Sequence, residues 1–247
     1  MSLSDTAAAG VLDQCLRGVA FAAAGSSFAA LAANGGAEVS GTGYVRQAVT
    51  FGAATTAQPS VVTAAAELNF GTVAGDWTPL AVDEVRLHSA LTGGTLLASD
   101  TDTQITYVAG NRAFIRAGMT FDFGSNSIWS AAYSATVNEW LWRSGTAPAQ
   151  ARYLGLLNAG TELSGGNYAR LDTNTLWAAA SVADPSSISF TGGAQQFIAS
   201  ATFTGTVNQL GLYSATTGGS PLITIAVTSQ AVANGDEVTV NPTITLT

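Results

Sequence analysis

Apolar residues near the start of the chain recur with the spacing of a helix. They fall at i, i+1, i+4 and i+5 and so share one helix face: Val11, Leu12, Cys15 and Leu16. Ser4 stands before this stretch and Gly18 follows it, and these residue types begin and end helices. The pattern predicts a helix over residues 6–17.

A second helical stretch lies near the middle of the chain, over residues 139–143. Thr136 or Asn138 is the expected N-terminal cap, and Ser144 with the glycine that follows it closes the stretch. Both predicted helices end on leucine and arginine shortly before a glycine, so the two segments resemble each other.

Short apolar runs and alternating stretches after each helix predict strands. The apolar runs lie at residues 28–31 and 153–157, and each leads into a turn rich in Asn and Gly. Residues 44–51 then alternate between apolar and polar side chains, as does the stretch after Tyr168. These segments are expected to be paired strands.

Longer strand signals follow in each half. Residues 82–88 and residues 207–213 both predict a core strand, and each is followed by a Thr-Gly-Gly turn. The final run, residues 237–246, alternates with a period of two. Pro242 lies inside this run and would confine the predicted strand to a sheet edge or mark a bulge, because proline has no N–H to donate.

The first half of the sequence recurs in the second half. Residues 38–46 read EVSGTGYVR and residues 162–170 read ELSGGNYAR, with Glu, Ser, Gly, Tyr and Arg in the same places. Residues 87–95 and 212–220 repeat in the same order at nearly the same spacing, and both halves end on an alternating tail. Three blocks in one order indicate a tandem duplication.

The duplication divides the chain into a first module over residues 1–130 and a second module over residues 131–247. Each is long enough to bury a core of its own. Many short strands, glycine-rich turns and one helix per half predict a mainly β fold. We expect two tandem β-sandwich modules of jelly-roll-like type, each preceded by a short α-helix and joined by a short linker near residues 124–135.

Composition narrows the classes of protein to which the chain can belong. Hydrophobic residues make up 47% and charged residues 10%, which excludes disorder driven by high charge. The chain has no lysine, and its eight arginines face sixteen acidic residues, for a net charge of −8. That balance argues against binding to a nucleic-acid backbone. No positive segment precedes the first apolar stretch, and no apolar run could span a bilayer.

Residues that could carry chemistry are sparse. His88 is the only histidine, and its counterpart in the second half is Tyr213, so we expect a packing role. Cys15 is the only cysteine, cannot form an internal disulfide, and is expected to be a small apolar core residue. We predict no catalytic residue, cofactor site or metal site. The aspartates are scattered and follow no calcium-loop spacing, which leaves a structural Ca²⁺ open: Asp100, Asp102, Asp172 and Asp184.

The recurring motif supplies the candidate site residues. They are the same four residue types in each half: Glu38, Gly41, Tyr44, Arg46, Glu162, Gly165, Tyr168 and Arg170. One interpretation is a ligand or partner site that is present twice. The other is a structural ion pair that pins a loop to the following strand, with the tyrosine hydroxyl bound to a polar partner. Burying one charge without the other is costly, so retention of both charges favours the structural interpretation.

Tryptophans gather around the middle of the chain. Trp129, Trp140 and Trp142 flank the predicted linker, while Trp77 and Trp177 lie within the modules. These rings could form a carbohydrate-stacking patch. We expect them instead to fill the seam between the halves or an interface between subunits.

These residues resemble a family of bacteriophage structural proteins described as tail-fibre-like or virion proteins. The resemblance rests on the N-terminal MSLS and its helix, on EVSGTGYVRQAVTF, on Trp77, on the Gly-Gly turn and on the alternating tail. It is close over residues 1–123 and looser over residues 131–247, where Leu171 stands for Gln47 and no tryptophan matches Trp77. The resemblance implies a particle component without catalysis.

The expected function is therefore that of a non-enzymatic virion structural protein on the particle surface. It would decorate or cement the capsid or form part of a tail fibre. Its partners would be other virion proteins and further copies of itself in a closed homo-oligomer, most simply a trimer, with neither nucleic acid nor membrane as a partner. The alternative is a receptor-binding module for a host-surface glycan, which would need an exposed cleft with aromatic and polar side chains.

Overall fold

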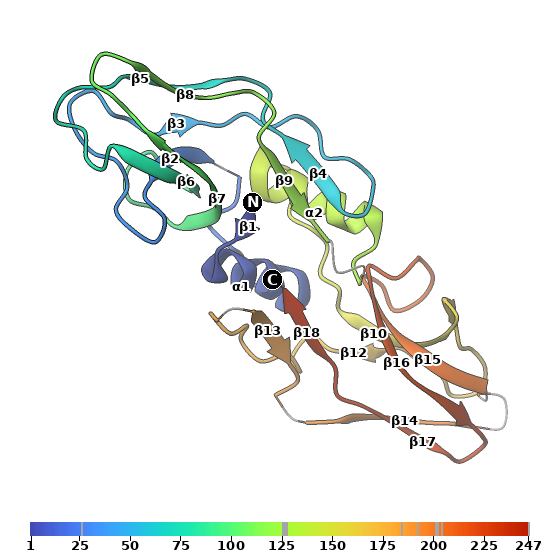
Figure 1. Ribbon diagram of the computed structural model, residues 1–247. Helices are drawn as coiled ribbons and strands as arrows, with labels where there is room; N and C mark the ends of the chain where they lie inside the picture. The colour runs from blue at the N-terminus through green and yellow to red at the C-terminus, as the bar shows by residue number, and fades with distance from the viewer. Residues whose placement is uncertain are drawn as a thin grey trace.

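The computed structural model describes residues 1–25, 27–124, 128–183, 185–191, 193–200, 203 and 205–246 (Figure 1). The predicted mainly β fold is confirmed, and its antiparallel sheets are consistent with β-sandwich modules. Within these ranges no helix is long and apolar enough to cross a membrane.

The first half contains a helix, a π-helical turn and a series of strands. They are β1 (Ser2–Leu3), α1 (Asp5–Leu12), η1 (Asp13–Arg17), β2 (Phe28–Ala32), β3 (Gln47–Ala48), β4 (Ser60–Thr63), β5 (Leu68–Thr72), β6 (Ala81–His88), β7 (Leu96–Thr106), β8 (Arg112–Ile115) and β9 (Thr120–Phe123). The second half repeats this order. Its elements are α2 (Ala131–Arg143), β10 (Tyr153–Asn158), β11 (Thr161–Glu162), β12 (Leu171–Asp172), β13 (Ser186–Ser189), β14 (Gln195–Ile198), β15 (Gly205–Tyr213), β16 (Ile223–Val232), β17 (Glu237–Val240) and β18 (Thr243–Leu246).

Both halves have the same strand order. The larger sheet of the first half runs β7-β6-β2-β3, and that of the second half runs β16-β15-β10, with β12 paired to β10. The registers agree as well, because His88 pairs with Phe28 and Tyr213 pairs with Tyr153. Two ribbons complete each half, β5-β8 with β4-β9 and β14-β17 with β13-β18. The predicted duplication is confirmed by this shared topology.

The glycine turns that helped to identify the repeat also share a backbone conformation. Gly93 and Gly94 have φ angles of 61° and 75°, and Gly218 and Gly219 have φ angles of 67° and 71°. Glycine adopts this left-handed region without the steric cost that a Cβ would bring. The Thr-Gly-Gly blocks therefore mark the same tight turn after the same strand.

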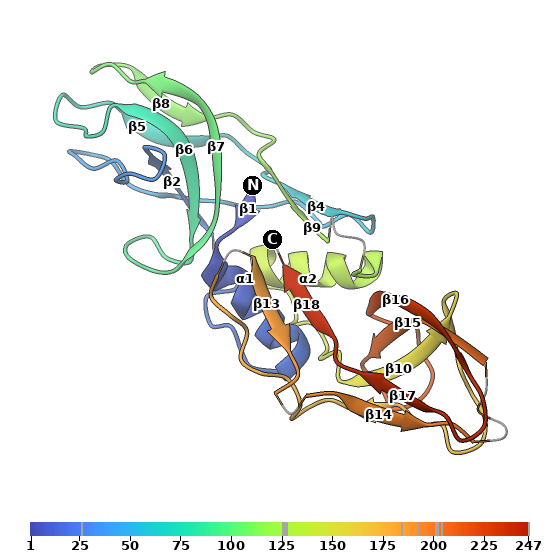
Figure 2. The ribbon, with the colours of Figure 1, turned by 60° about the horizontal axis from the view of Figure 1, so that its bottom comes forward.

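The two helices are exchanged between the halves. Helix α1, from the first half, packs against β13 and β18 of the second half as well as against β7. Helix α2, which opens the second half, packs against β4 and β9 of the first half. Figure 2 shows the helices side by side in the centre, with the strands of the two halves extending to opposite sides. One ribbon of each half, β4-β9 or β13-β18, is thus covered by the helix that belongs, by sequence, to the other module.

Large apolar side chains and buried hydrogen bonds fix α2 in this position. The indole of Trp142 is 2% exposed and lies 4.5 Å from the ring of Phe121 and 5.7 Å from that of Phe51, measured between centroids. The buried amide of Asn138 donates to the backbone oxygen of Ser60 at 2.9 Å and to its hydroxyl at 3.1 Å. These contacts tie α2 to β4 and β9.

Polar contacts hold α1 and η1 to the second half in the same way. The hydroxyl of Ser186 donates to the carbonyl of Asp5 at 3.0 Å, and the amide of Ala180 donates to the carboxylate of Asp13 at 3.0 Å. The amide of Ala151 donates to the carbonyl of Cys15 at 2.7 Å. The thiol of Cys15 is fully buried, and burial raises its pKa to about 12, which fits the expected core role.

The start of the second helix was predicted wrongly. Ser130 is the N-cap of α2, and its hydroxyl accepts from the amide of Tyr133, as the hydroxyl of Ser4 does from that of Ala7 in α1. Thr136 lies inside the helix and donates to the carbonyl of Ala132. The predicted linker is shorter than expected, since α2 begins at Ala131; residues 125–127 lie outside the described ranges.

Strand lengths also differ from the sequence pattern. The expected strand at residues 237–246 is two strands, β17 and β18, which pair with β14 and β13 on either side of Pro242. Of the alternating residues 44–51, only Gln47–Ala48 pair as a strand, with β2. In both cases the choice of partner strand, which alternation does not encode, sets where pairing ends.

We predict that Trp142→Ala weakens the first half although Trp142 belongs to the second module by sequence. Loss of a fully buried indole costs about 3–5 kcal/mol of the free energy of unfolding. Hydrogen exchange should rise at β4 and β9 more than at β13 and β18. Phe114→Ala, at a ring that is 36% exposed, is the control and should change stability little. Faster exchange confined to the second half would contradict the exchanged packing.

A circular permutant tests whether the two chain ends are neighbours in the folded protein. The two chain ends lie beside each other in both views, near the helices (Figures 1 and 2). Joining them with a short linker and opening the chain at residues 125–127 should give a folded protein with a similar melting temperature, because neighbouring ends need only a short connection. A permutant opened inside β6, which must lose sheet pairing, is the control. Equal damage in both permutants would contradict the prediction.

Candidate functional site

The recurring Glu-x-Ser-Gly motif forms the same charged corner in both halves. The guanidinium of Arg46 donates through Nε to Oε1 of Glu38 at 2.9 Å and through Nη2 to Oε2 at 2.6 Å. Arg170 binds Glu162 in the same two-pronged way, at 2.7 Å and 2.6 Å. The predicted contacts are therefore present in both modules, with the paired geometry that makes arginine–carboxylate bonds strong.

Each arginine also fastens the corner to a neighbouring turn. The Nη1 atom of Arg46 donates to the carbonyls of Ala90 at 2.8 Å and Gly93 at 2.5 Å, and that of Arg170 donates to the carbonyl of Ala215 at 2.6 Å. The arginine side chains are 10% and 2% exposed, respectively. The charged pair thus connects the motif loop to the hairpin turn that carries the paired glycines.

His88 and Tyr213 occupy equivalent places beside the two corners. The guanidinium of Arg170 lies 3.4 Å from the ring centroid of Tyr213, a cation–π contact. The Nε2 atom of His88 lies 3.9 Å from Oε2 of Glu38. Burial, together with the charge of Arg46, holds the pKa of His88 below its usual value, so the ring is neutral at pH 7. Both rings pack against the ion pair, in the role that the sequence predicted.

The tyrosines of the motif bind backbone inside each module. The hydroxyl of Tyr44 accepts from the amide of Leu31 at 2.8 Å, and that of Tyr168 accepts from the amide of Leu156 at 2.9 Å. Burial raises the pKa of both hydroxyls, so they stay protonated. The hydroxyl of Tyr168 can therefore donate to Glu162, which it does at 2.9 Å.

The glycines allow the close approach of neighbouring chain. Gly41 has a φ angle of 141°, and a Cβ at this position would lie 2.9 Å from the Cα of Trp77. Gly165 has a φ angle of 108°, also in the region that favours glycine. A larger residue at Gly41 would have to displace the backbone at Trp77.

An aromatic ring covers the tyrosine in each half, although the sequence comparison found no match for Trp77. The rings of Tyr44 and Trp77 lie 5.3 Å apart, and those of Tyr168 and Phe203 lie 5.0 Å apart, between centroids. Phe203 therefore takes the place of Trp77 in the second module. Sequence spacing missed this pair because a phenylalanine replaces the tryptophan.

The tryptophans do not form an exposed patch. The exposed fraction is 7% or less for all five: Trp77, Trp129, Trp140, Trp142 and Trp177. Trp129 stacks on Tyr133 and meets Phe123 edge-on, and Trp140 meets Phe21. The carbohydrate-stacking interpretation is wrong for these rings, and the predicted seam between the halves is where Trp129, Trp140 and Trp142 lie.

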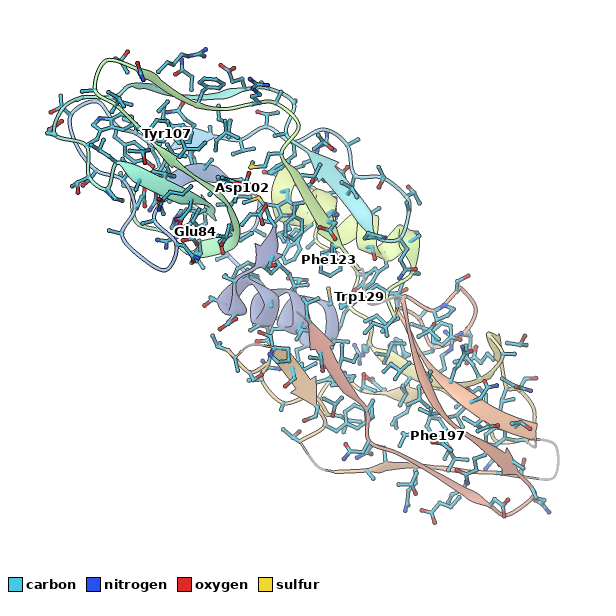
Figure 3. All side chains as sticks on the ribbon, in the orientation of Figure 1. Glu84, Asp102, Tyr107, Phe123, Trp129 and Phe197 are labelled. Carbon is cyan, nitrogen blue, oxygen red and sulfur yellow. The ribbon has the colours of Figure 1, made fainter. Side chains whose placement is uncertain are left out.

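The first half also contains an open cleft of about 800 Å³ between β7 and β8. Leu31 and Val82 are buried in its floor, while Asp102 and Arg116 are exposed at its rim. Figure 3 labels Glu84, Asp102 and Tyr107, which line it. No sequence pattern indicates this cleft, because its walls come together only when the sheet and the ribbon pack.

Potential metal ligands do not gather elsewhere. Within the described ranges no group of three or more His, Cys, Asp or Glu side chains is placed to hold a metal ion. Asp172 instead binds Arg152, with Oδ2 2.6 Å from Nη2. Asp184 lies outside the described residues.

Comparison with known families follows the same division of the chain. Residues 2–120 match the family described as podophage GP4 fiber I protein gp80, and residues 127–246 match it again. The chain belongs to this family. It is accordingly a bacteriophage virion structural protein of fibre-like type that carries the family unit twice. No curated protein matches the chain.

The role of the corners as structural motifs stays a prediction, and Arg170→Ala tests it. Removal of this buried partner should cost about 1–3 kcal/mol of the free energy of unfolding, since Glu162 keeps its burial but loses its charge-assisted bonds. Arg46→Ala should also lower the free energy of unfolding. Unchanged melting temperatures together with reduced binding to virus particles would show that both pairs belong to a partner site and do not stabilise the fold.

The pH dependence of stability gives a second readout for the same variant. Burial opposes ionisation of Glu162, but its bonds from Arg170 and Tyr168 prevail and hold the pKa of this carboxyl below its usual value. A lowered pKa stabilises the fold above the unfolded-state pKa of about 4.5, and this contribution is lost as the pH falls through the folded-state value. The melting temperature of Arg170→Ala should therefore fall less on acidification than that of the unchanged protein.

Proposed function

We propose that this protein is a non-enzymatic component of a fibre on the outside of the phage particle. The observation that carries the proposal is the family match over both halves of the chain. The family description favours a fibre over capsid decoration or cementing. Capsid decoration remains the competing assignment, and copy number separates the two.

The architecture suits a rigid structural part. Two β-rich halves extend in opposite directions from the central helices, which gives the elongated outline in Figure 1. Because each helix packs on the other half, a change in the angle between the halves would have to break both sets of helix contacts. A rigid connection between the halves suits a fibre component, which must extend from the particle without bending.

The charged groups support a role without catalysis. In the described part of the chain, every arginine except Arg116 forms an ion pair with a carboxylate. His88, the only histidine, is kept neutral beside an ion pair. Groups committed to such contacts serve the fold rather than acid–base chemistry.

We propose a closed homo-oligomer, most simply a trimer, bound to other virion proteins. Large apolar side chains are exposed on both halves and could be covered by such contacts, among them Val45, Leu91, Val182 and Ile198. The short helices, by contrast, give no support for an oligomer, because they are covered within the chain. The net charge of −8 argues against nucleic acid as a partner. A membrane is not among the proposed partners.

Two measurements test this proposal. Quantitative mass spectrometry of purified particles should find a small number of copies, a multiple of three, because fibres occupy few attachment sites. Native mass spectrometry of the purified protein should give the mass of three chains. Hundreds of copies per particle would favour capsid decoration, and a stable monomer that does not bind particles would contradict the oligomer.

A further inference from the structure

The cleft between β7 and β8 has the size and lining of a ligand site. Its volume of about 800 Å³ is within the usual range for small-molecule sites. The buried floor is apolar, and Ile115 and Met119 extend it toward the rim. Asp100, Asp102 and Arg116 add exposed charged groups around this floor. A ligand with both apolar and hydrogen-bonding surface would fit such a lining.

Arg116 is the most distinctive group in the cleft. It is the one arginine in the described part of the chain without a carboxylate partner, in a protein that has no lysine and a net charge of −8. Its exposed guanidinium is free to bind an anionic group with two parallel hydrogen bonds. A carboxylate has the negative charge and the planar geometry that match this guanidinium.

An aromatic ring and hydroxyl-binding groups line the same cleft as Arg116. The ring of Phe114 is 36% exposed, and the guanidinium of Arg112 lies 5.1 Å from its centroid. Tyr107 is half-buried in the cleft, and burial raises the pKa of its hydroxyl, which stays a donor at neutral pH. Asp102 supplies carboxylate oxygens that accept from hydroxyl groups.

The duplicated module provides an internal comparison. By strand register, the second half has Ile225 in place of Asp100, and Asn241 follows β17 where Arg116 follows β8. The remaining replacements follow the same alignment: Val227 for Asp102, Glu237 for Arg112 and Thr239 for Phe114. The fold alone does not require the charged and aromatic lining, since the second half forms the same strands without it.

We propose that this cleft binds an acidic saccharide, with the carboxylate of the sugar on Arg116, the ring face near Phe114 and hydroxyl groups on Asp100 and Asp102. A bare cation would suit the aspartates but would be repelled by Arg112 and Arg116. A nucleic acid carries a negative charge on every phosphate, so the protein's net charge of −8 would repel it more strongly than a sugar with a single carboxylate. The proposal rests on the proposed function in that the cleft must be on the outside of the particle.

Binding to the purified, tag-free full-length protein tests the site directly. Tag-free protein is needed because Met1 lines the cleft. Isothermal titration should detect oligosaccharides that contain hexuronic or sialic acid, with weaker or no binding of the same sugars after reduction of the carboxyl group to an alcohol. Citrate tests whether a carboxylate alone is sufficient, and binding of citrate as tight as that of the sugars would contradict the saccharide assignment.

Matched variants locate the site. Arg116→Ala should weaken binding tenfold or more, because a charge-assisted pair is lost, and Phe114→Ala should weaken it as well. Asn241→Ala, at the equivalent position of the second half, should bind as the unchanged protein does. Melting curves check that all three variants are folded.

Several outcomes would overturn the proposal. They are failure of the unchanged protein to bind any acidic sugar of the panel, binding that Arg116→Ala leaves intact, and equal loss of binding in Asn241→Ala. If Arg116→Ala reduces attachment to particles while no sugar binds, the partner of the cleft is a virion protein. None of these results bears on copy number, so the proposed fibre role is tested separately.

Discussion

The exchange of helices between the two halves is the constraint on which the rest of this structure depends. A short helix is marginal alone and is stabilised mainly by packing of its apolar face. Here α1 finds that packing on β13 and β18, and α2 finds it on β4 and β9. The ribbons β4-β9 and β13-β18 in turn each rely on a helix that the other module supplies. The duplication therefore produced two modules that each supply a helix to the other, rather than two independently packed domains.

The two charged corners lie away from the helices, one in each module. A bidentate arginine–glutamate pair, with one further donor to a hairpin turn, connects three segments that do not pair directly with one another. The arginine is more deeply buried than its partner in both corners. Loss of the arginine leaves a partly buried carboxylate unpaired, whereas loss of both charges would be less costly. Both copies keep the complete pair.

Duplication also allows the surface side chains of one copy to change while both copies keep the same strands. The cleft of the first half and the corresponding surface of the second half share their strands but not their side chains. Residues that bind or shape the backbone recur in both halves, such as the glycines of the turns and the tyrosines of the corners. Residues at the cleft rim differ, which is expected where a surface contact rather than packing decides the side chain.

Sequence alone determined the β-rich class, the duplication, the N-cap of the first helix and the contact between Glu38 and Arg46, because these follow from local periodicity or from a repeated spacing. It missed Ser130 as the second cap, the division of residues 237–246 into two strands and the match between Phe203 and Trp77. Only the tertiary structure decided which helix covers which ribbon and where the cleft opens. An amphipathic pattern states that a face is buried but not against what, since contacts between distant segments depend on chain topology, which short-range patterns do not encode.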